Sequence, residues 1–189
     1  MSAMSRCLLV PALLLISLWA ATKSVQAQVI EEEVSFHSGD ITLHGSDLIP
    51  ARSEPGTAIV LIHGAGLGLR DENRAVAEAF ADEGFLVLIY DKRTEGYSPD
   101  PVGGRSYSLL ADDAIVAVQM LQQHDDVDPA QVGLWGFSEG GWVAPLAATR
   151  SDDVAFVITV AGGGIGPAEQ TAWATEGELR RQVVTSGGR

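Results

Sequence analysis

The chain is short of cysteine and of basic residues, and each shortage excludes a class of protein. Cys7 is the single cysteine among 189 residues, which excludes a disulfide framework and a metal site built from thiolates. Lys and Arg together number 12 against 25 Asp and Glu, so the formal net charge is −13. Nucleic-acid backbones and anionic membrane surfaces repel such a chain, and we expect neither as a partner. Its chemistry has to come from oxygen and nitrogen groups, and we expect no metal and no cofactor.

Residues 1–27 have the pattern of a targeting segment. Arg6 supplies a positive charge, an apolar stretch of about 15 residues follows at 7–21, and a polar stretch ends at 25–27. The apolar stretch is shorter than the roughly 20 residues that a membrane-spanning helix needs. Small residues before position 28 suit signal peptidase. We therefore expect a signal peptide that is cleaved near Ala27, and a secreted or periplasmic mature chain with no stable membrane insertion.

The remaining sequence has a composition that can form a core, with 46% hydrophobic residues. A turn-rich spacer at 38–40 separates the β-rich runs 34–36 and 41–43, which indicates an antiparallel hairpin. Unbroken apolar runs, typical of parallel strands covered on both faces, follow at 58–62, 85–90, 132–135 and 154–160.

Helical patterns separate these apolar runs. Asp71 is the candidate N-cap of the first helix. A short helix is expected at 142–149 and a polar helix at 168–184. The apolar faces of the first two helices consist of Val76, Ala79, Phe80 and Ala81, and of Leu110, Ala114, Ala117, Val118 and Leu121.

This alternation predicts an α/β fold with a mostly parallel sheet and helices on both faces. Ligands bind at the carboxyl ends of the strands in such sheets. We therefore expect the loops that follow the strands to share one rim, namely 63–70, 91–98, 136–140 and 161–166.

The pentapeptide 136–140 reads Gly-Phe-Ser-Glu-Gly and fits the pattern G-x-S-x-G. Three fixed residues occur by chance roughly 0.06 times in a chain of this length, so the weight of the motif comes from its place between a strand and a helix. Gly136 and Gly140 permit a sharp turn there, which exposes the Ser138 hydroxyl above the sheet. The sequence predicts that Ser138 is a catalytic nucleophile; the alternative is a serine N-cap in a glycine-rich turn.

A serine that attacks a carbonyl group creates an oxyanion, which needs two preorganised hydrogen-bond donors. The start of the helix supplies the backbone N–H of Glu139, and the loop after the first central strand supplies that of Ala65. We expect His63 and Gly64 to support this loop, His63 through hydrogen bonds. His63 is not expected to be the base, because the triad order for this elbow is serine, acid, then histidine.

These segments resemble those of α/β-hydrolases, and more narrowly those of bacterial serine esterases and of their dienelactone-hydrolase-like and serine-peptidase neighbours. The resemblance covers roughly residues 30–165 and implies an α/β-hydrolase fold, an acyl-enzyme on Ser138 and a small ester or peptide substrate. It also implies that the loop 91–98 supports the site. It rests on His63-Gly64-Ala65-Gly66 with Arg70-Asp71-Glu72, on Tyr90-Asp91-Lys92-Arg93 with Gly96 and Ser98, and on 136–141.

The chain departs from this family at Thr94, where Gly is common, at Phe137, where His is common, and above all in its histidines. All four of them precede Ser138, at His37, His44, His63 and His124. Carboxylates after Ser138 (Asp152, Asp153, Glu169, Glu176 and Glu178) are expected to be solvated charges. We therefore expect residues 28–189 to form an incomplete hydrolase domain that lacks its C-terminal strands, has the start of a cap or lid at 168–189, and is inactive by itself.

Two other functions fit parts of the sequence. A dinucleotide-binding protein is suggested by Gly64-Ala65-Gly66-Leu67-Gly68 after a strand, with Asp91 at the end of the next strand. That fingerprint fails at Leu69, where it requires Gly or Ala, and it leaves the serine turn unexplained. A secreted, non-catalytic binding module with a hydrolase-like fold is the second alternative, supported by the missing base.

Overall fold

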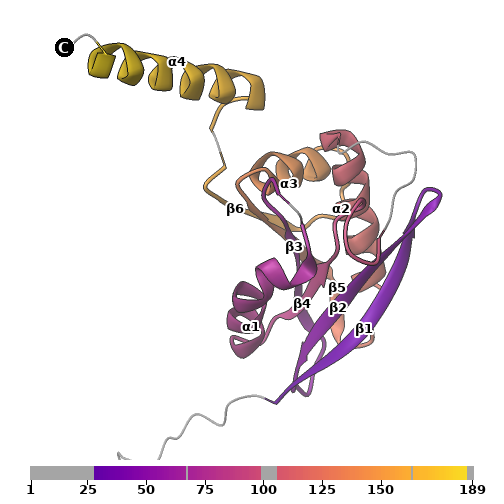
Figure 1. Cartoon of the computed structure of the whole chain (residues 1–189). Coiled ribbons are helices and arrows are strands. Elements are labelled where there is room, and N and C mark those ends of the chain that lie inside the picture. Colours follow the sequence, from indigo (N-terminus) through magenta and orange to yellow (C-terminus); the bar gives the residue numbers. More distant parts are fainter. Residues whose placement is uncertain (1–27, 67, 99–105, 163, 187–189) are drawn as a thin grey trace, which may run out of the picture.

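A computed structural model describes residues 28–66, 68–98, 106–162 and 164–186, and the side chains as far as residue 179 (Figure 1). The expected signal peptide, 1–27, lies outside the described residues. The strands are β1 (Val29–Ser38), β2 (Ile41–Pro50), β3 (Gly56–Ile62), β4 (Leu86–Tyr90), β5 (Val127–Phe137) and β6 (Phe156–Val160). The helices are the 3₁₀-helix η1 (Arg70–Asn73), α1 (Arg74–Asp82), α2 (Tyr107–Leu121), α3 (Gly140–Ala148) and α4 (Pro167–Ser186).

The strands form one six-stranded sheet in the order β1-β2-β4-β3-β5-β6. β1 and β2 form the expected antiparallel hairpin, in which Ser38 pairs with Ile41 around a two-residue turn. Gly39 opens that turn with a φ of +61°, which a residue without a Cβ adopts readily. β2 is also antiparallel to β4, whereas β3, β4, β5 and β6 run parallel. The predicted α/β class and mostly parallel sheet are confirmed.

Helices cover both faces of the sheet, as the sequence predicts (Figure 1). On one face α2 and α3 pack against each other and against β5, and the five residues of the predicted α2 face are all buried. On the other face α1 packs against β2 and β4. Ala77 and Ala81 are the fully buried residues of α1, whereas Ala79, which was expected on its apolar face, is exposed.

The first helix begins differently from the prediction. A 3₁₀ turn precedes α1, and the N-cap is Asn73, whose side chain makes no capping hydrogen bond. Asp71 is not the cap, because its carboxylate accepts a hydrogen bond of 2.7 Å from Nε of Arg74. Helix capping was the wrong role for Asp71 because an arginine three residues later competes for the same oxygen atoms.

The C-terminal helix α4 projects away from the sheet (Figure 1). Trp173 is 70% exposed on it, and Glu169, Glu176 and Glu178 are exposed as expected. α4 does not cover β6, where the side chains of Ile158 and Val160 are 37% and 39% exposed. None of the described helices combines the length and the apolar character needed to cross a membrane.

Candidate functional site

The loops that follow the parallel strands meet at one rim. The backbone N–H of Lys92, after β4, donates to the carbonyl of Gly68 at 2.8 Å. The N–H of Ser138, after β5, donates to the carbonyl of Val160 at the end of β6, also at 2.8 Å. The shared rim that we expected from the parallel strands is thus present in the described residues.

Ser138 lies in a strained turn between β5 and α3. Its φ is +50°, a left-handed conformation that residues with a Cβ rarely adopt. The turn needs the two glycines around it, because a Cβ on Gly136 would lie 2.0 Å from the carbonyl oxygen of Gly140. A Cβ on Gly140 would lie 2.5 Å from the carbonyl oxygen of Ile62. A half-buried serine is therefore held at the junction of the central strands and the first turn of α3.

The loop after β3 lies directly against this turn. A Cβ on Gly64 would approach the Cβ of Ser138 to 3.4 Å and the ring of Phe137 to 3.1 Å. Ala65 is exposed in the same loop, and Glu139 follows Ser138 at the N-cap of α3. Among the described residues, no backbone carbonyl accepts a hydrogen bond from the N–H of Ala65 or Glu139. Neither N–H group is therefore engaged by a backbone acceptor in this part of the chain, and the roles expected of Ala65 and Glu139 stay predictions.

His63 is built into the same loop and is buried. Its Nε2 lies 3.1 Å from the carbonyl oxygen of Leu69, and its ring meets the ring of Tyr90 edge to face at 5.9 Å. Burial, together with the charge of Lys92, lowers the pKa of His63 to about 4. The ring is therefore neutral at physiological pH, and it spans the loop 63–69.

The other three histidines have partners away from the serine. His37 is hydrogen-bonded to Thr42 at 3.2 Å, and His124 accepts a bond of 3.1 Å from the N–H of Asp126. His44 lies edge to face against Tyr97. Within the part of the chain that the structure describes, no histidine ring is hydrogen-bonded to Ser138.

Lys92 connects the loops of the rim, a role that the sequence did not suggest. Its Nζ donates to the carbonyl of Gly64 at 2.7 Å and to Oε1 of Glu139 at 2.8 Å. The partners stand 28 and 47 positions away in the sequence, and no periodic pattern connects them. The available signals were its place in the family-like stretch 90–93 and its position two residues after the end of β4.

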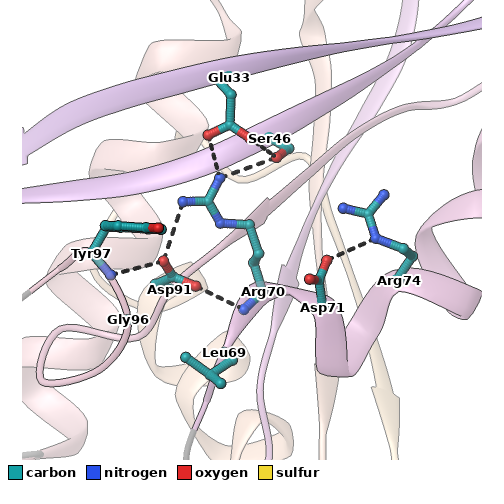
Figure 2. Close-up of a pocket in the computed structure, with 9 residues that line it drawn as sticks. All are labelled: Glu33, Ser46, Leu69, Arg70, Asp71, Arg74, Asp91, Gly96 and Tyr97. Atoms are coloured by element: carbon teal, nitrogen blue, oxygen red, sulfur yellow. Dashed lines mark hydrogen bonds and ion pairs between the residues drawn. The ribbon is translucent and has the colours of Figure 1, made fainter.

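A second polar network, shown in Figure 2, fixes the loop after β4 on the β2 side of the rim. Nη1 of Arg70 donates to Glu33 at 2.7 Å and to Ser46 at 3.1 Å, and its Nη2 donates to Asp91 at 3.2 Å. The backbone N–H groups of Arg70 and Tyr97 also donate to Asp91, at 2.9 and 3.1 Å. Burial opposes the ionisation of Asp91, but these hydrogen bonds outweigh it and lower its pKa.

This network decides against a dinucleotide site. A ribose would need a free carboxylate on Asp91, whereas both oxygen atoms of this buried group already accept hydrogen bonds from Arg70 and Tyr97. A cavity of about 280 Å³ lies beside the network, but the charge of Arg70 is matched there by Glu33 and Asp91. The structure therefore uses Asp91 to hold the 91–98 loop.

The described residues contain no group of three or more His, Cys, Asp or Glu side chains that could hold a metal ion. Arg93 instead forms a buried ion pair with Asp113 of α2, with Nε and Oδ2 2.9 Å apart. Ser98 accepts a hydrogen bond of 2.9 Å from the N–H of His44. These contacts attach the loop after β4 to α2 and β2.

The sequence is similar to a known protein family and to known enzymes. The model of the serine aminopeptidase S33 family matches residues 53–182. The esterase EstD of Thermotoga maritima is 34% identical over 127 residues, which are 62% of this chain and 30% of the esterase. The thiohydrolase aneE of Aspergillus aculeatus is 33% identical over 106 residues, 56% of this chain and 33% of that enzyme.

Among solved structures, the α/β hydrolase GrgF of Penicillium sp. sh18 superimposes with a TM-score of 0.63 at 26% identity, over 85% of this chain and 56% of GrgF. The matched region thus spans about a third of the length of the two curated relatives and just over half of the length of GrgF. The family model covers most of the chain and includes the serine turn, the loop after β3 and the loop after β4. The chain therefore belongs to the serine aminopeptidase S33 family of the α/β-hydrolase superfamily.

Proposed function

We propose that Ser138 is the nucleophile of a serine hydrolase that cleaves carboxylic esters, with peptide or amide bonds as the alternative substrates. The observation that carries this proposal is the left-handed backbone of Ser138, with a φ of +50° in a turn closed by Gly136 and Gly140. Strain of this kind costs about 1–3 kcal/mol and persists where the surrounding structure enforces it, often at active sites. A serine that served only as a helix cap would not require it.

The chemistry follows from the neighbours of Ser138. Its Oγ would attack the carbonyl carbon of the substrate, forming a C–O bond while its proton passes to a base. The negative charge that develops on the carbonyl oxygen would be stabilised by the N–H groups of Ala65 and Glu139 and by the N-terminus of α3. Expulsion of the alcohol or amine leaves an acyl-enzyme on Ser138, which water then hydrolyses.

The base is the part of this mechanism that the 189 residues do not supply. No histidine follows Ser138 in the sequence, and His63 faces the carbonyl of Leu69 with its pKa lowered to about 4. Without a base the hydroxyl of Ser138 is a weak nucleophile. We therefore propose that this chain alone binds substrate without sustained turnover.

Its acidic mature part would act in a secreted or periplasmic location.

A non-catalytic binding module with the same fold is the second candidate. It is favoured by one observation, the lack of any hydrogen bond between a histidine ring and Ser138 in the described residues. The two functions differ in their dependence on the serine hydroxyl. A binding module should bind its ligand equally well after Ser138→Ala.

Turnover of p-nitrophenyl acetate tests the proposal, measured for the protein as its gene encodes it and for the 189-residue chain. We expect kcat of the gene product to fall by several orders of magnitude in Ser138→Ala, with an unchanged melting temperature, because the half-buried hydroxyl contributes little to packing. The 189-residue chain should show negligible turnover. Sustained turnover that survives Ser138→Ala would contradict the assignment, and Ser138-dependent turnover by the 189-residue chain would show that another group replaces the histidine.

A further inference from the structure

The ammonium group of Lys92 bridges the two segments that carry the candidate oxyanion donors. It lies 2.7 Å from the carbonyl oxygen of Gly64 on one side and 2.8 Å from Oε1 of Glu139 on the other. The residue is only 2% exposed, so water does not compete for these bonds. The N–H groups of Ala65 and Glu139 have no backbone acceptor in the described residues, and both groups adjoin these two contacts.

The contact with Gly64 has a direct consequence for Ala65. The carbonyl of Gly64 and the N–H of Ala65 belong to the same peptide group, which is planar and in which the two bonds point in opposite directions. An ammonium that holds the carbonyl on one side of the loop therefore fixes the direction of the N–H on the other side. The positive charge also polarises the peptide, which makes the N–H a stronger donor.

The contact with Glu139 acts on the second donor. Glu139 has helical backbone angles, φ −54° and ψ −41°, at the first turn of α3. Its side chain makes no capping bond within the helix and is bound to Lys92 instead. The residue that carries the N–H is thus tied by this charge-assisted pair to Lys92 in the loop after β4, and the same ammonium also holds the carbonyl of Gly64 in the loop after β3.

The path of the Lys92 side chain is built into the fold. The lysine N–H donates to the carbonyl of Gly68, which sets the start of the side chain. Its aliphatic stem then passes over Gly68, where a Cβ would lie 2.7 Å from Cβ and 3.0 Å from Cε of Lys92. Gly68 also has a φ of +74°, so glycine fits this position in both respects.

We propose that Lys92 is a positioning residue that sets both oxyanion donors of this site from a single ammonium group. The proposal rests on the proposed function, in which Ser138 attacks a carbonyl group. Lys92 acts through the Gly64–Ala65 peptide and through Glu139, and it takes no part in bond making or proton transfer. A lysine that serves only to stabilise the fold would leave the geometry of the Ala65 N–H unaffected when it is replaced.

Two variants separate positioning from stability. Lys92→Met keeps the stem and removes both bonds, and it leaves the carboxylate of Glu139 without its partner. The double variant Lys92→Met/Glu139→Gln also removes that uncompensated charge and protects the folded state. In the gene product both variants should lower kcat for p-nitrophenyl acetate about 10- to 100-fold, with KM changed less than about threefold, because donors displaced by a fraction of an ångström lose transition-state contacts. Lys92→Arg should recover part of kcat.

The amide resonances of Ala65 and Glu139 give a readout that does not depend on activity. In the ¹⁵N-labelled gene product, Lys92→Met should shift both amides. That of Ala65 should shift because the preceding carbonyl, that of Gly64, loses its bond to Lys92. Arg93→Met is the matched control: Arg93 follows Lys92 in the chain and forms a buried ion pair with Asp113, and its loss should leave the Ala65 amide resonance unchanged.

The outcomes separate the two proposals. Unchanged Ala65 and Glu139 resonances in folded Lys92→Met overturn the positioning role, and so does a kcat that falls only in proportion to the folded fraction. Shifted resonances in a gene product that has no Ser138-dependent turnover support the role of Lys92 in shaping the loop and contradict the proposed function alone.

Discussion

Ser138 and Ala161 are the two non-glycine residues with positive φ in the described chain, at +50° and +54°. They lie at the ends of adjacent strands, and the N–H of Ser138 is bonded to Val160, next to Ala161. A left-handed backbone costs an L-residue roughly 1–2 kcal/mol. The rim therefore stores strain at two neighbouring positions, and only one of them carries a reactive group.

Relief of this strain can be measured. Ser138→Gly should raise the free energy of unfolding by about 0.5–1 kcal/mol relative to Ser138→Ala, because glycine adopts positive φ without the Cβ clash. Ala161→Gly, at the matched position, should raise stability by a similar amount relative to the wild type. Urea unfolding followed by circular dichroism gives both values. Equal stabilities of Ser138→Gly and Ser138→Ala would show that the turn is not strained.

Asp47 is a buried carboxyl group that the fold does not satisfy. It lies on β2 between Glu32 of β1 and Leu88 of β4, it is 2% exposed, and its Oδ1 has no hydrogen-bond partner. Burial and the nearby charge of Glu32 raise its pKa from the ordinary 3.8 to about 7. Between about pH 4 and pH 7 the folded protein therefore keeps a proton that the unfolded chain releases.

The sign of the pH dependence follows. Because the pKa of Asp47 is raised by folding, its contribution to stability is greatest below about pH 4 and is lost as the pH rises to about 7, a difference of about 2–4 kcal/mol. Asp47→Asn, which resembles the protonated acid, should raise the melting temperature at pH 8 and leave it nearly unchanged at pH 4. Glu32→Gln should give a smaller increase at pH 8. A gain from Asp47→Asn that is the same at both pH values would refute this account.

The site residues differ in how far sequence could find them. The places of Ser138 and of the loop 63–66 in the fold were predictable because local patterns, a glycine-bounded serine and a strand end, restrict the backbone there; their catalytic roles stay predictions. Lys92 and Arg70 could be recognised from the sequence only as members of a family-like motif. Their contacts could not be predicted, because the partners Glu139 and Glu33 come from distant segments. Local periodicity carries no information about such contacts.

At the scale of elements, β6 is the exposed end of the sheet. Among the described strands it pairs with β5 alone. Ile158 and Val160 lie on the face of the sheet that α1 covers, but α1 packs there against β2 and β4 and leaves these two side chains partly exposed. An open row of N–H and C=O groups beside apolar side chains attracts other strands. The helix α4 projects away from this edge and does not cover it (Figure 1).

This edge gives a prediction for the chain 28–189. It should bind a hydrophobic dye and self-associate at micromolar concentration, and Ile158→Lys should reduce both effects because a charged side chain on an edge strand opposes pairing. Leu179→Lys, on exposed α4, is the matched control for added charge and should have less effect. Dye fluorescence and sedimentation velocity test this; a monodisperse wild-type chain without dye binding would contradict it.

Most elements were predictable to within a few residues, because apolar runs and helical periodicity report burial directly. The strands β1, β2 and β5, however, extend at one end five to seven residues beyond the runs that predicted them. The five positions of the α2 face are the clearest case. The start of α1 was wrong because the choice between a cap and an ion pair at Asp71 depends on Arg74. Strand order and the antiparallel contact of β2 with β4 needed the structure, since they depend on which edges meet.

At the scale of the whole molecule, the chain is strongly acidic, whereas Arg70, Lys92 and Arg93 at the rim are paired with carboxylates. Residues 1–27 contain two of the basic residues and none of the acidic ones, so residues 28–189 carry 10 basic against 25 acidic residues, a net charge of −15. Long-range repulsion of anionic substrates follows from this charge and weakens as salt screens it. Neutral esters, whose approach the field does not affect, fit the proposed chemistry better.

The central claim is that Ser138 is the nucleophile, and mapping a covalent adduct tests it most directly. The gene product is treated with a fluorophosphonate, digested and analysed by mass spectrometry, with Ser138→Ala and the strain-matched Ala161→Gly in parallel. We predict a phosphonate adduct on the peptide that contains Ser138, its loss in Ser138→Ala and its retention in Ala161→Gly. An adduct on a different serine, still formed in Ser138→Ala, would contradict the account.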